Sequence, residues 1–262
     1  MRIPIFQVDA FTSRIFSGNP AAVCPLEAWI SDGSMQAIAA ENTLSETAFF
    51  VGGAGRYAIR WFTPVTEVDL CGHATLASAH VIFESDPKLA QIVFQSKSGP
   101  LGVKRAGDWL ELDFPARPAS RAEEWRTSVS EALGAMPAEV WAARDLYAVY
   151  GSEERVRSLR PDMRRLADLG VFAVAATAPG GECDFVSRFF APREGIPEDP
   201  VTGSAHCTLA PFWASRLGKS SLLARQVSSR GGELRCVVQG ERVLISGQAA
   251  TYLEGAIQVE LG

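Results

Sequence analysis

The sequence predicts an α+β fold of two related halves, each a curved and mostly antiparallel sheet wrapped on one central helix. Residues 60–74 and 188–205 repeat one motif, Arg-aromatic-Phe-small-Pro followed by Glu-x-x-x-x-Gly-x-Ala, with three extra residues in the second copy. Each copy opens a long apolar helical stretch, and the predicted strands outnumber the helices. A repeat of this length is typical of a chain built from two similar units.

The first half is predicted to consist of strands around one long helix. Apolar residues recur at helical spacing from residue 31 and predict a first helix that stops near residues 41–43. Residues 72–83, rich in alanine, are predicted to form the central helix. Apolar runs bounded by turns predict the strands of this half. They are residues 3–11, 21–24, 46–51, 57–64, 91–94, 102–104 and 109–114.

A linker is predicted at residues 115–120, where two prolines and small residues mark a change of composition. The expected first domain is residues 1–117, with the last strand, residues 252–262, packing back onto it. The expected second domain is residues 118–262. Its predicted helices are residues 128–133 and 203–217, and its predicted strands are residues 146–150, 171–176, 184–190, 233–239 and 242–246.

Composition narrows the class of protein. At 262 residues the chain is long enough for two domains of ordinary size. The net charge is −5 and no run of Lys or Arg stands out, which argues against nucleic acid as the main partner. No apolar run approaches the roughly 18 residues that a membrane-spanning helix needs, and the first residues read as a strand and not as a secretion signal. The five cysteines are odd in number and form no Cys-x-x-Cys pair, so we expect no disulfide framework and no metal site, in a reducing cytoplasm.

Two Gly-x-Ala turns are candidate anion sites. Gly72 and Gly203 each stand where a strand gives way to a helix. Such a start leaves backbone N–H groups free and carries about half a positive charge. Gly72 in the first turn, and Gly203 with Ser204 in the second, could therefore hold a carboxylate or phosphate without a basic side chain. The alternative is that any helix needs a start, but two matched turns favour the functional interpretation.

Glu46, His73 and Asp199 are candidate acid/base groups. Glu46 precedes an apolar strand, and a carboxyl group half-buried at a domain edge holds its proton more tightly than in water, as a general base requires. An ordinary surface glutamate at a strand start is the alternative. His73 lies inside the repeated turn, where an imidazole can move protons near neutral pH. Asp199 precedes the second turn and either caps the helix or faces a cleft, and chain spacing leaves that choice open.

Cys71 immediately precedes Gly72. A helix N-terminus lowers the pKa of a thiol, so a thiolate base at Cys71 is conceivable. The matching residue of the second copy is Thr202, whose hydroxyl is far too weak an acid to act as a partner. The sequence therefore argues against a symmetric mechanism with two thiols.

Four motifs, in this order along the chain, resemble the PhzF family of phenazine-biosynthesis isomerases and their relatives. They are Phe-Ser-Gly-Asn-Pro-Ala-Ala-Val at 16–23, Ser-Glu-Thr-Ala-Phe at 45–49, Asp-Leu-Cys-Gly-His-Ala-Thr at 69–75 and Glu-Asp-Pro-Val-Thr-Gly-Ser-Ala-His at 198–206. The glycine-rich stretch 228–232 also looks like a late turn of that family. The resemblance covers nearly the whole chain and is specific for the family, but it does not fix a substrate.

The resemblance implies a diaminopimelate-epimerase-like fold, with two pseudo-symmetric domains and the active site between them. It implies proton transfer without a cofactor, with Glu46 as the acid/base and with His73 and Asp199 beside it. It implies substrate contacts from Asn19 and Ser45 and from the backbone amides of the two Gly-x-Ala turns, which would hold a carboxylate. The expected partner is thus a small carboxylated metabolite. Members of the family are commonly homodimers, so a homodimer is also expected.

Two other functions stay open. Cys71 is one thiol where the wider epimerase group uses two, which makes a one-thiol epimerase or dehydratase of amino-acid-like substrates the second hypothesis. The third hypothesis is a protein of the same fold that binds a metabolite or a partner without turnover, because a shared fold does not prove catalysis.

Overall fold

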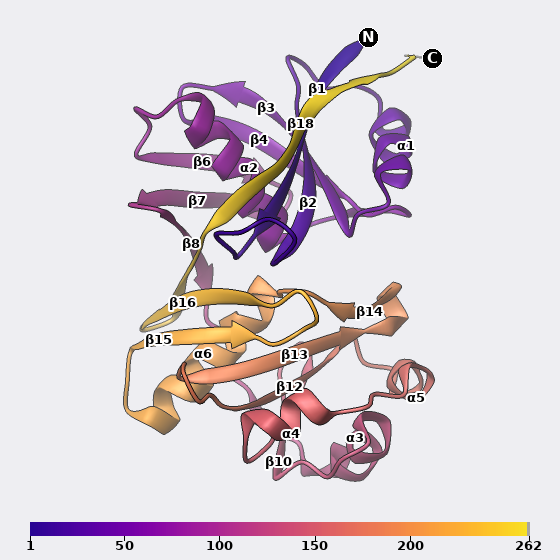
Figure 1. Ribbon diagram of the computed structural model, residues 1–262, viewed down its shortest axis with the longest axis vertical. Coiled ribbons are helices and arrows are strands. Elements are labelled where there is room, and N and C mark those ends of the chain that lie inside the picture. The colour runs from indigo at the N-terminus through magenta and orange to yellow at the C-terminus, as the bar shows by residue number, and fades with distance from the viewer. Residues whose placement is uncertain (261–262) are drawn as a thin grey trace. The chain divides into compact units, whose positions relative to one another are not determined.

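The computed structural model describes residues 1–260 and divides the chain into two compact units (Figure 1). Unit 1 is Met1–Asp113 together with the segment from Ser246 onward, and unit 2 is Phe114–Ile245. The chain thus changes unit close to the expected boundary at residue 117. The segment that returns to unit 1 begins earlier than the expected residue 252.

Unit 1 is a curved sheet that packs on one helix. Its strands run in the order β18–β1–β2–β3–β4–β6–β7–β8, and the short β5 also pairs with β4. Only the β2–β3 and β4–β6 neighbours are parallel among these ladders, so the sheet is mostly antiparallel, as predicted. The bounds are β1 (Arg2–Ala10), β2 (Asn19–Pro25), β3 (Glu46–Gly53), β4 (Arg56–Phe62), β5 (Glu67–Val68), β6 (Gln91–Ser96), β7 (Gly99–Ala106), β8 (Trp109–Pro115) and β18 (Ala249–Gln258).

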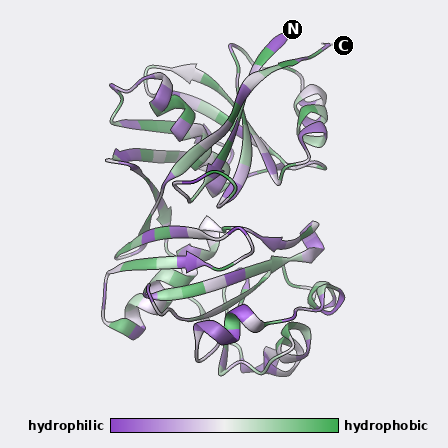
Figure 2. Cartoon of the chain, viewed as in Figure 1, coloured by the Kyte–Doolittle hydropathy of each residue, from purple (hydrophilic) through white to green (hydrophobic). Residues whose placement is uncertain are grey.

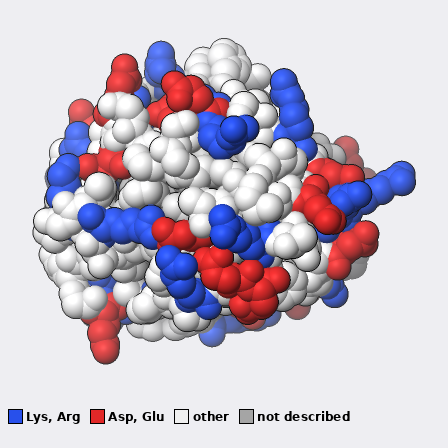
Figure 3. Space-filling view, turned by 90° about the horizontal axis from the view of Figure 1, so that it is seen from below, with Lys and Arg blue, Asp and Glu red and all other residues white. Residues whose placement is uncertain are grey.

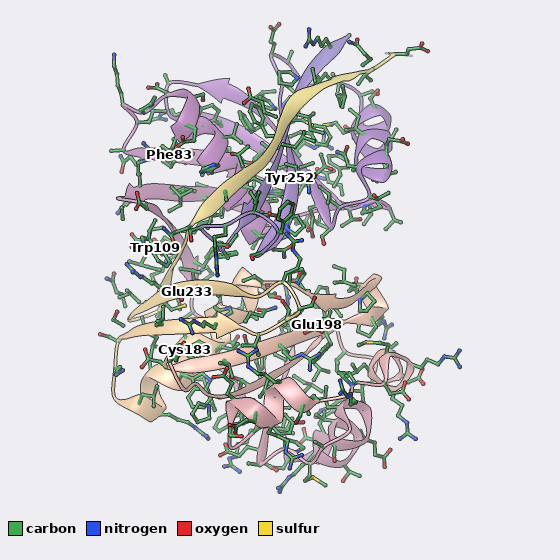
Figure 4. The ribbon with its side chains drawn as sticks, in the orientation of Figure 1. Phe83, Trp109, Cys183, Glu198, Glu233 and Tyr252 are labelled. Carbon is green, nitrogen blue, oxygen red and sulfur yellow. The ribbon has the colours of Figure 1, made fainter. Side chains whose placement is uncertain are left out.

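The central helix of unit 1 is α2 (Gly72–Ser85), on which Phe83 is labelled in Figure 4. Nearly every residue from His73 to Phe83 is buried, and a helix that is buried all round lies inside its sheet. α2 contacts β1, β2, β3, β7 and β18. The other helix, α1 (Asp32–Asn42), packs against β3 and β4, and its N-terminus is capped by the side chain of Ser31.

Unit 2 repeats this arrangement. Its strands run in the order β9–β10–β11–β12–β13–β15–β16, with β14 also paired to β13 and with β11–β12 and β13–β15 parallel. The central helix is α6 (Gly203–Leu217), which contacts β15 and β16. The other bounds are β9 (Ser120–Arg121), η1 (Glu123–Trp125), α3 (Arg126–Leu133), β10 (Glu139–Ala142), β11 (Leu146–Val149), α4 (Glu153–Ser158), α5 (Met163–Asp168), β12 (Val174–Pro179), β13 (Phe185–Ala191), η2 (Pro192–Glu194), β14 (Ile196–Asp199), β15 (Ser221–Gln226), β16 (Gly232–Gln239) and β17 (Arg242–Gly247).

The repeated motif forms the same local structure in both units. Arg60 donates two hydrogen bonds to the carboxylate of Glu67, at 2.7 and 2.8 Å. Arg188 does the same to Glu198, at 2.8 and 2.9 Å. Each guanidinium also lies over the aromatic ring two residues further along its strand, 5.1 and 5.0 Å from the ring centre. The motif therefore encodes a strand with an arginine whose ion pair stabilises the turn that leads into the central helix.

Some short elements of unit 2 are absent from the sequence prediction. Helices α4 and α5 have six residues each and β10 has four, which is too short for a helical or strand period to show. In Figure 2, α4 is mainly purple, as expected of a short surface helix, whereas green apolar residues recur along the strands of both sheets.

The described residues include no helix that is both long and apolar enough to cross a membrane. On the face of the molecule that Figure 3 shows, acidic and basic side chains are interspersed. Several of the surface arginines lie in ion pairs, such as Arg157 with Glu153 and Arg165 with Glu131. That face therefore shows no extended patch of a single charge.

Candidate active site

The candidate residues of unit 1 come from three neighbouring elements. Asn19 begins β2, Glu46 begins β3 and Gly72 begins α2. The two strands are parallel neighbours, with Ala21 opposite Glu46, so both start at the same edge of the sheet. Helical side chains tilt toward the helix N-terminus. The side chain of His73, in the first turn of α2, therefore lies near the starts of both strands.

His73 is the centre of this cluster. Its Nε2 lies 3.1 Å from Oε2 of Glu46, and the two side chains are 8% and 12% exposed. The approach is not aligned as a hydrogen bond, and neither atom has a hydrogen-bond partner among the described residues. Buried polar atoms without partners are uncommon in native proteins and often mark functional sites. We interpret this pair as prepared for a group of the substrate.

The other ring nitrogen, Nδ1 of His73, faces Asn19 and Cys71. Nδ2 of Asn19 is 3.3 Å away and Sγ of Cys71 is 3.5 Å away. Asn19 donates to Nδ1 when that nitrogen carries no proton, and Nδ1 donates to the sulfur when it does. The imidazole is therefore held in place in either protonation state.

The surroundings of His73 favour its protonated form. Burial alone would lower its pKa, but the Cys71 and Glu46 side chains beside its two ring nitrogens raise the pKa of His73 well above the usual 6.5. Burial raises the pKa of the Cys71 thiol, which is therefore uncharged near neutral pH. Both neighbours of the ring therefore favour the protonated form of His73. The expectation that the helix start lowers the pKa of Cys71 is wrong, because burial outweighs the helix dipole.

Three side chains of the cluster offer metal-ligand atoms. Those of Glu46, Cys71 and His73 lie within 4.8 Å of one another. The carboxylate approaches Nε2 of the imidazole, however, while the thiol approaches Nδ1. One metal ion binds one nitrogen of a given imidazole, so the arrangement suits a chain of proton-bearing groups better than a metal centre.

Neither central helix is capped by a side chain at its start. Cys71 and Thr202 occupy the cap positions with extended backbones, and neither side chain accepts a hydrogen bond from the helix. The carboxylate of Asp199, three residues before Thr202, accepts the Thr202 hydroxyl. The side chains at the two cap positions therefore leave the first N–H groups of these helices available to an anion.

In unit 2, Asp199 belongs to a buried hydrogen-bond network. The hydroxyl of Thr202 donates to Oδ2 of Asp199 at 2.5 Å. Oε1 of Gln226 accepts from the Thr202 backbone at 2.9 Å, and its Nε2 donates to the Asp199 carbonyl at 2.7 Å. Sequence reasoning missed Gln226, which lies at the end of β15 and reaches Asp199 only because β15 pairs with β13. In the second turn, Arg144 donates a long hydrogen bond of 3.5 Å to Ser204, beside Gly203.

The two units differ at the positions that matter for chemistry. By strand register, the residue of unit 2 that corresponds to Glu46 is Ala173. By motif, the residue that corresponds to His73 is Ser204. Within the described residues, the carboxylate–imidazole pair is therefore a feature of unit 1 and has no copy at the matching positions of unit 2.

The remaining sequence candidates lie outside this cluster or at its border. Ser45 is half-buried and adjoins Glu46 in the chain. Nε2 of His80 lies 3.0 Å from the Thr251 hydroxyl, and burial lowers the pKa of His80. His206 is buried, and its Nδ1 lies 2.9 Å from the carbonyl oxygen of Thr202. Burial lowers the pKa of His206 to about 4. Both histidines are therefore neutral near pH 7, in contrast to the histidine of the cluster.

Comparison with known proteins gives consistent matches. A family model described as phenazine biosynthesis-like protein matches residues 8–255. A protein of Pseudomonas aeruginosa named as an uncharacterised isomerase is 52% identical, over 99% of this chain and 100% of the relative. A PhzF-family crystal structure from Enterococcus faecalis is 45% identical, with a TM-score of 0.96 over 99% and 100% of the two chains. A hydroxyproline epimerase from Agrobacterium vitis, 12% identical with a TM-score of 0.62 over 98% and 92%, shares the fold alone. These matches confirm the predicted α+β, epimerase-like fold.

Proposed function

The chain belongs to the phenazine biosynthesis-like PhzF family and is an isomerase, and we propose that it moves a proton on a small carboxylated metabolite without a cofactor, with Glu46 as the general acid/base. The observation that supports this proposal most is the buried contact of 3.1 Å between Glu46 and His73, in which both facing atoms lack a hydrogen-bond partner among the described residues.

The geometry suits proton transfer at carbon. A carboxylate that removes such a proton must be close to the substrate and poorly hydrated, and Glu46 is nearly buried. As the proton leaves, negative charge develops on an oxygen conjugated with the reacting carbon. The protonated His73 carries an Nε2–H that is not engaged in a hydrogen bond, so it can donate to that oxygen. Glu46 then returns the proton to a different carbon, which completes an isomerisation.

The start of α2 supports the choice of a carboxylated substrate. It presents N–H groups that the side chain of Cys71 does not cap, and no acidic side chain occupies its first turn. Backbone N–H groups together with the helix dipole favour a carboxylate there. The matched start of α6 offers a second group of uncapped N–H donors in unit 2, where Gln226 and Thr202 fix the orientation of Asp199.

The test is exchange of solvent deuterium. Wild-type protein is incubated in heavy water with a panel of small carboxylated metabolites, and mass spectrometry identifies those that gain deuterium. We expect Glu46→Gln, which keeps the side-chain shape, to lose this exchange by about 100-fold or more. The control is Glu27→Gln, because Glu27 is exposed and lies outside the cluster. Full exchange with Glu46→Gln would remove Glu46 as the acid/base.

A second candidate function rests on the contact of 3.5 Å between Cys71 and His73. In this mechanism a one-thiol epimerase or dehydratase of amino-acid-like substrates passes the proton of Cys71 to the neutral form of His73, and the thiolate that remains acts as the base. Turnover that falls on Cys71→Ser as steeply as on Glu46→Gln would favour it. Turnover that persists would remove it, with Cys183→Ser as the control for a thiol outside the cluster.

The third hypothesis, binding without turnover, receives no support from relatives named isomerases. We also propose that the protein works in the cytoplasm, because all five cysteines are free thiols and a reducing compartment keeps them so.

A further inference from the structure

Two residues of unit 2 stand at positions that match the candidate site of unit 1. β11 and β12, the latter labelled in Figure 1, are parallel neighbours, as β2 and β3 are in unit 1. The register of these strands aligns Arg144, shortly before β11, with Pro20, the neighbour of Asn19. It aligns Phe172, shortly before β12, with Ser45. Arg144 and Phe172 therefore lie at the edge of the unit 2 sheet that matches the site edge of unit 1.

The guanidinium of Arg144 is held in place by two contacts within unit 2. Its Nε lies 3.1 Å from Oδ1 of Asp145, a buried carboxylate that also accepts the Tyr147 hydroxyl at 3.2 Å. Its central carbon lies over the ring of Phe172, 4.3 Å from the ring centre. A guanidinium that is planar and already stacked on a ring loses little freedom when it binds a ligand. Arg144 is thus preorganised, although 39% of its side chain is exposed.

The far end of the guanidinium is the part that these contacts leave available. Asp145 contacts Nε and lies buried, so the pair presents nitrogen donors and not the carboxylate to a ligand. Nη2 of Arg144 donates a hydrogen bond to Ser204 that is 3.5 Å long, at the limit of hydrogen-bond range. No other hydrogen bond or ion pair of the two terminal nitrogens occurs in residues 1–260. Two parallel N–H groups at this end are what an arginine uses to bind a carboxylate.

The charge of Arg144 acts on the first turns of α6. Burial raises the pKa of Cys207 to about 11, and the charges of Arg117 and Arg144 oppose that rise. No acidic residue occupies the first turn of α6, and Thr202 does not cap it with its side chain. Neutralisation of Asp145 explains the contact with Nε, but it does not require the stacking on Phe172, a ring that is itself 42% exposed.

We propose, as an extension of the proposed function, that Arg144 binds an acidic group of the substrate beside Ser204, so that the isomerase selects metabolites with two acidic groups. The start of α2 offers one carboxylate only backbone N–H groups and a partial charge. Arg144 adds a full positive charge, and hydrogen bonds between ionised partners are about twice as strong as neutral ones. The Ser204 hydroxyl, which accepts from Nη2 in the absence of a ligand, can donate its own proton to the same group.

Binding of simple acids tests this charge requirement without turnover. The probes are succinate, glutarate and adipate, each compared by isothermal titration calorimetry with the monocarboxylate of equal carbon number (butyrate, valerate and hexanoate). We expect wild type to bind at least one diacid about tenfold more tightly than its match, since hydrogen bonds to charged groups contribute that much. Arg144→Gln should remove this preference and leave the affinity for the monocarboxylate unchanged. A wild type without the preference, or a preference that Arg144→Gln retains, would overturn the proposal.

Two further variants separate binding from folding. Arg144→Gln leaves the buried Asp145 without its ion-pair partner, so it also lowers stability. Phe172→Ala keeps that ion pair and removes only the exposed ring, so we expect it to weaken the diacid preference severalfold with little change in thermal unfolding. The matched control is Arg155→Gln, because Arg155 is an exposed arginine of unit 2 that forms no ion pair with the described residues. A loss of preference in Arg155→Gln equal to that in Arg144→Gln would show that only the overall charge matters, against the proposal.

Deuterium exchange on the same variants keeps this proposal distinct from the proposed function. For a substrate found by exchange, Arg144→Gln should raise KM about tenfold with little change in kcat, because the residue binds the substrate and does not move the proton. Glu46→Gln should lose the exchange but keep the diacid preference. A fall in kcat with an unchanged KM in Arg144→Gln would assign Arg144 no part in binding. A wild type that prefers diacids but exchanges no proton would refute the isomerase mechanism and leave Arg144 as an acid-binding residue.

Discussion

Replacement of Glu46 by glutamine should change the protonation of His73 by an amount that the structure allows us to work out. The substitution removes a negative charge 3.1 Å from Nε2 in a nearly buried pair. With an effective dielectric constant of about 20, the Coulomb energy at that distance is about 5 kcal/mol. Loss of this attraction disfavours the charged form of the imidazole, so the pKa of His73 falls. Opposite charges at such distances usually shift a pKa by about 1–3 units.

We therefore expect the pKa of His73 to fall in Glu46→Gln, because the effect of burial, which lowers it, is then opposed by Cys71 alone. Cys71→Ser should lower the pKa of His73 less than Glu46→Gln does, because the buried thiol is uncharged near neutral pH and acts through its contact with Nδ1. The assay is a pH titration of the imidazole resonances by NMR with labelled histidine. The chain has only three histidines, and the pKa values of His80 and His206 are both lowered by burial.

The same titration has a consequence for stability. The pKa of His73 is raised in the folded protein, so the pair stabilises the fold fully below about pH 6.5, the ordinary value. That contribution is lost as the pH rises through the folded pKa of His73. A His73 that titrates at or below its ordinary value in wild type would refute this reasoning. A fall in Cys71→Ser as large as that in Glu46→Gln would show that a thiolate supplies the charge, as the one-thiol mechanism requires.

Three further predictions concern the scaffold. Arg188→Ala should destabilise the protein by about 2–4 kcal/mol in urea unfolding, because it leaves the half-buried Glu198 without its ion-pair partner; a loss below about 1 kcal/mol would contradict the structural role of the repeated arginine. Gly247→Ala should cost about 1–3 kcal/mol in thermal unfolding, because the new Cβ would lie 2.4 Å from Cδ1 of Phe11, and an unchanged melting temperature would argue against that packing. Gln226→Leu should reduce turnover more than it reduces stability, because it removes the hydrogen bonds that orient the turn before α6; equal activity in steady-state kinetics would assign Gln226 no part in the site.

Local patterns in the sequence were sufficient for the outline of the fold. The repeated arginine and glutamate, seven residues apart in the first copy and ten in the second, specify a strand and a turn that need few distant contacts. The apolar stretches after Gly72 and Gly203 specify helices that are buried over most of their length. These features can be predicted from the sequence because turn-forming residues and hydrophobic periodicity depend on residues that are close together in the chain. The family motifs likewise pointed to Glu46 and His73, and the structure places these two side chains in contact.

Only the tertiary structure decided how the site is assembled and which groups carry charge. The contact of His73 with Asn19 spans 54 residues, and that of Thr202 with Gln226 spans 24. Both depend on the pairing of strands that are distant in the chain, which no local pattern specifies. The helix start at Cys71 suggested a lowered pKa from sequence, but burial reversed the direction. Burial is a property of the whole packed unit, so the sequence determined which groups are present and the fold determined their protonation.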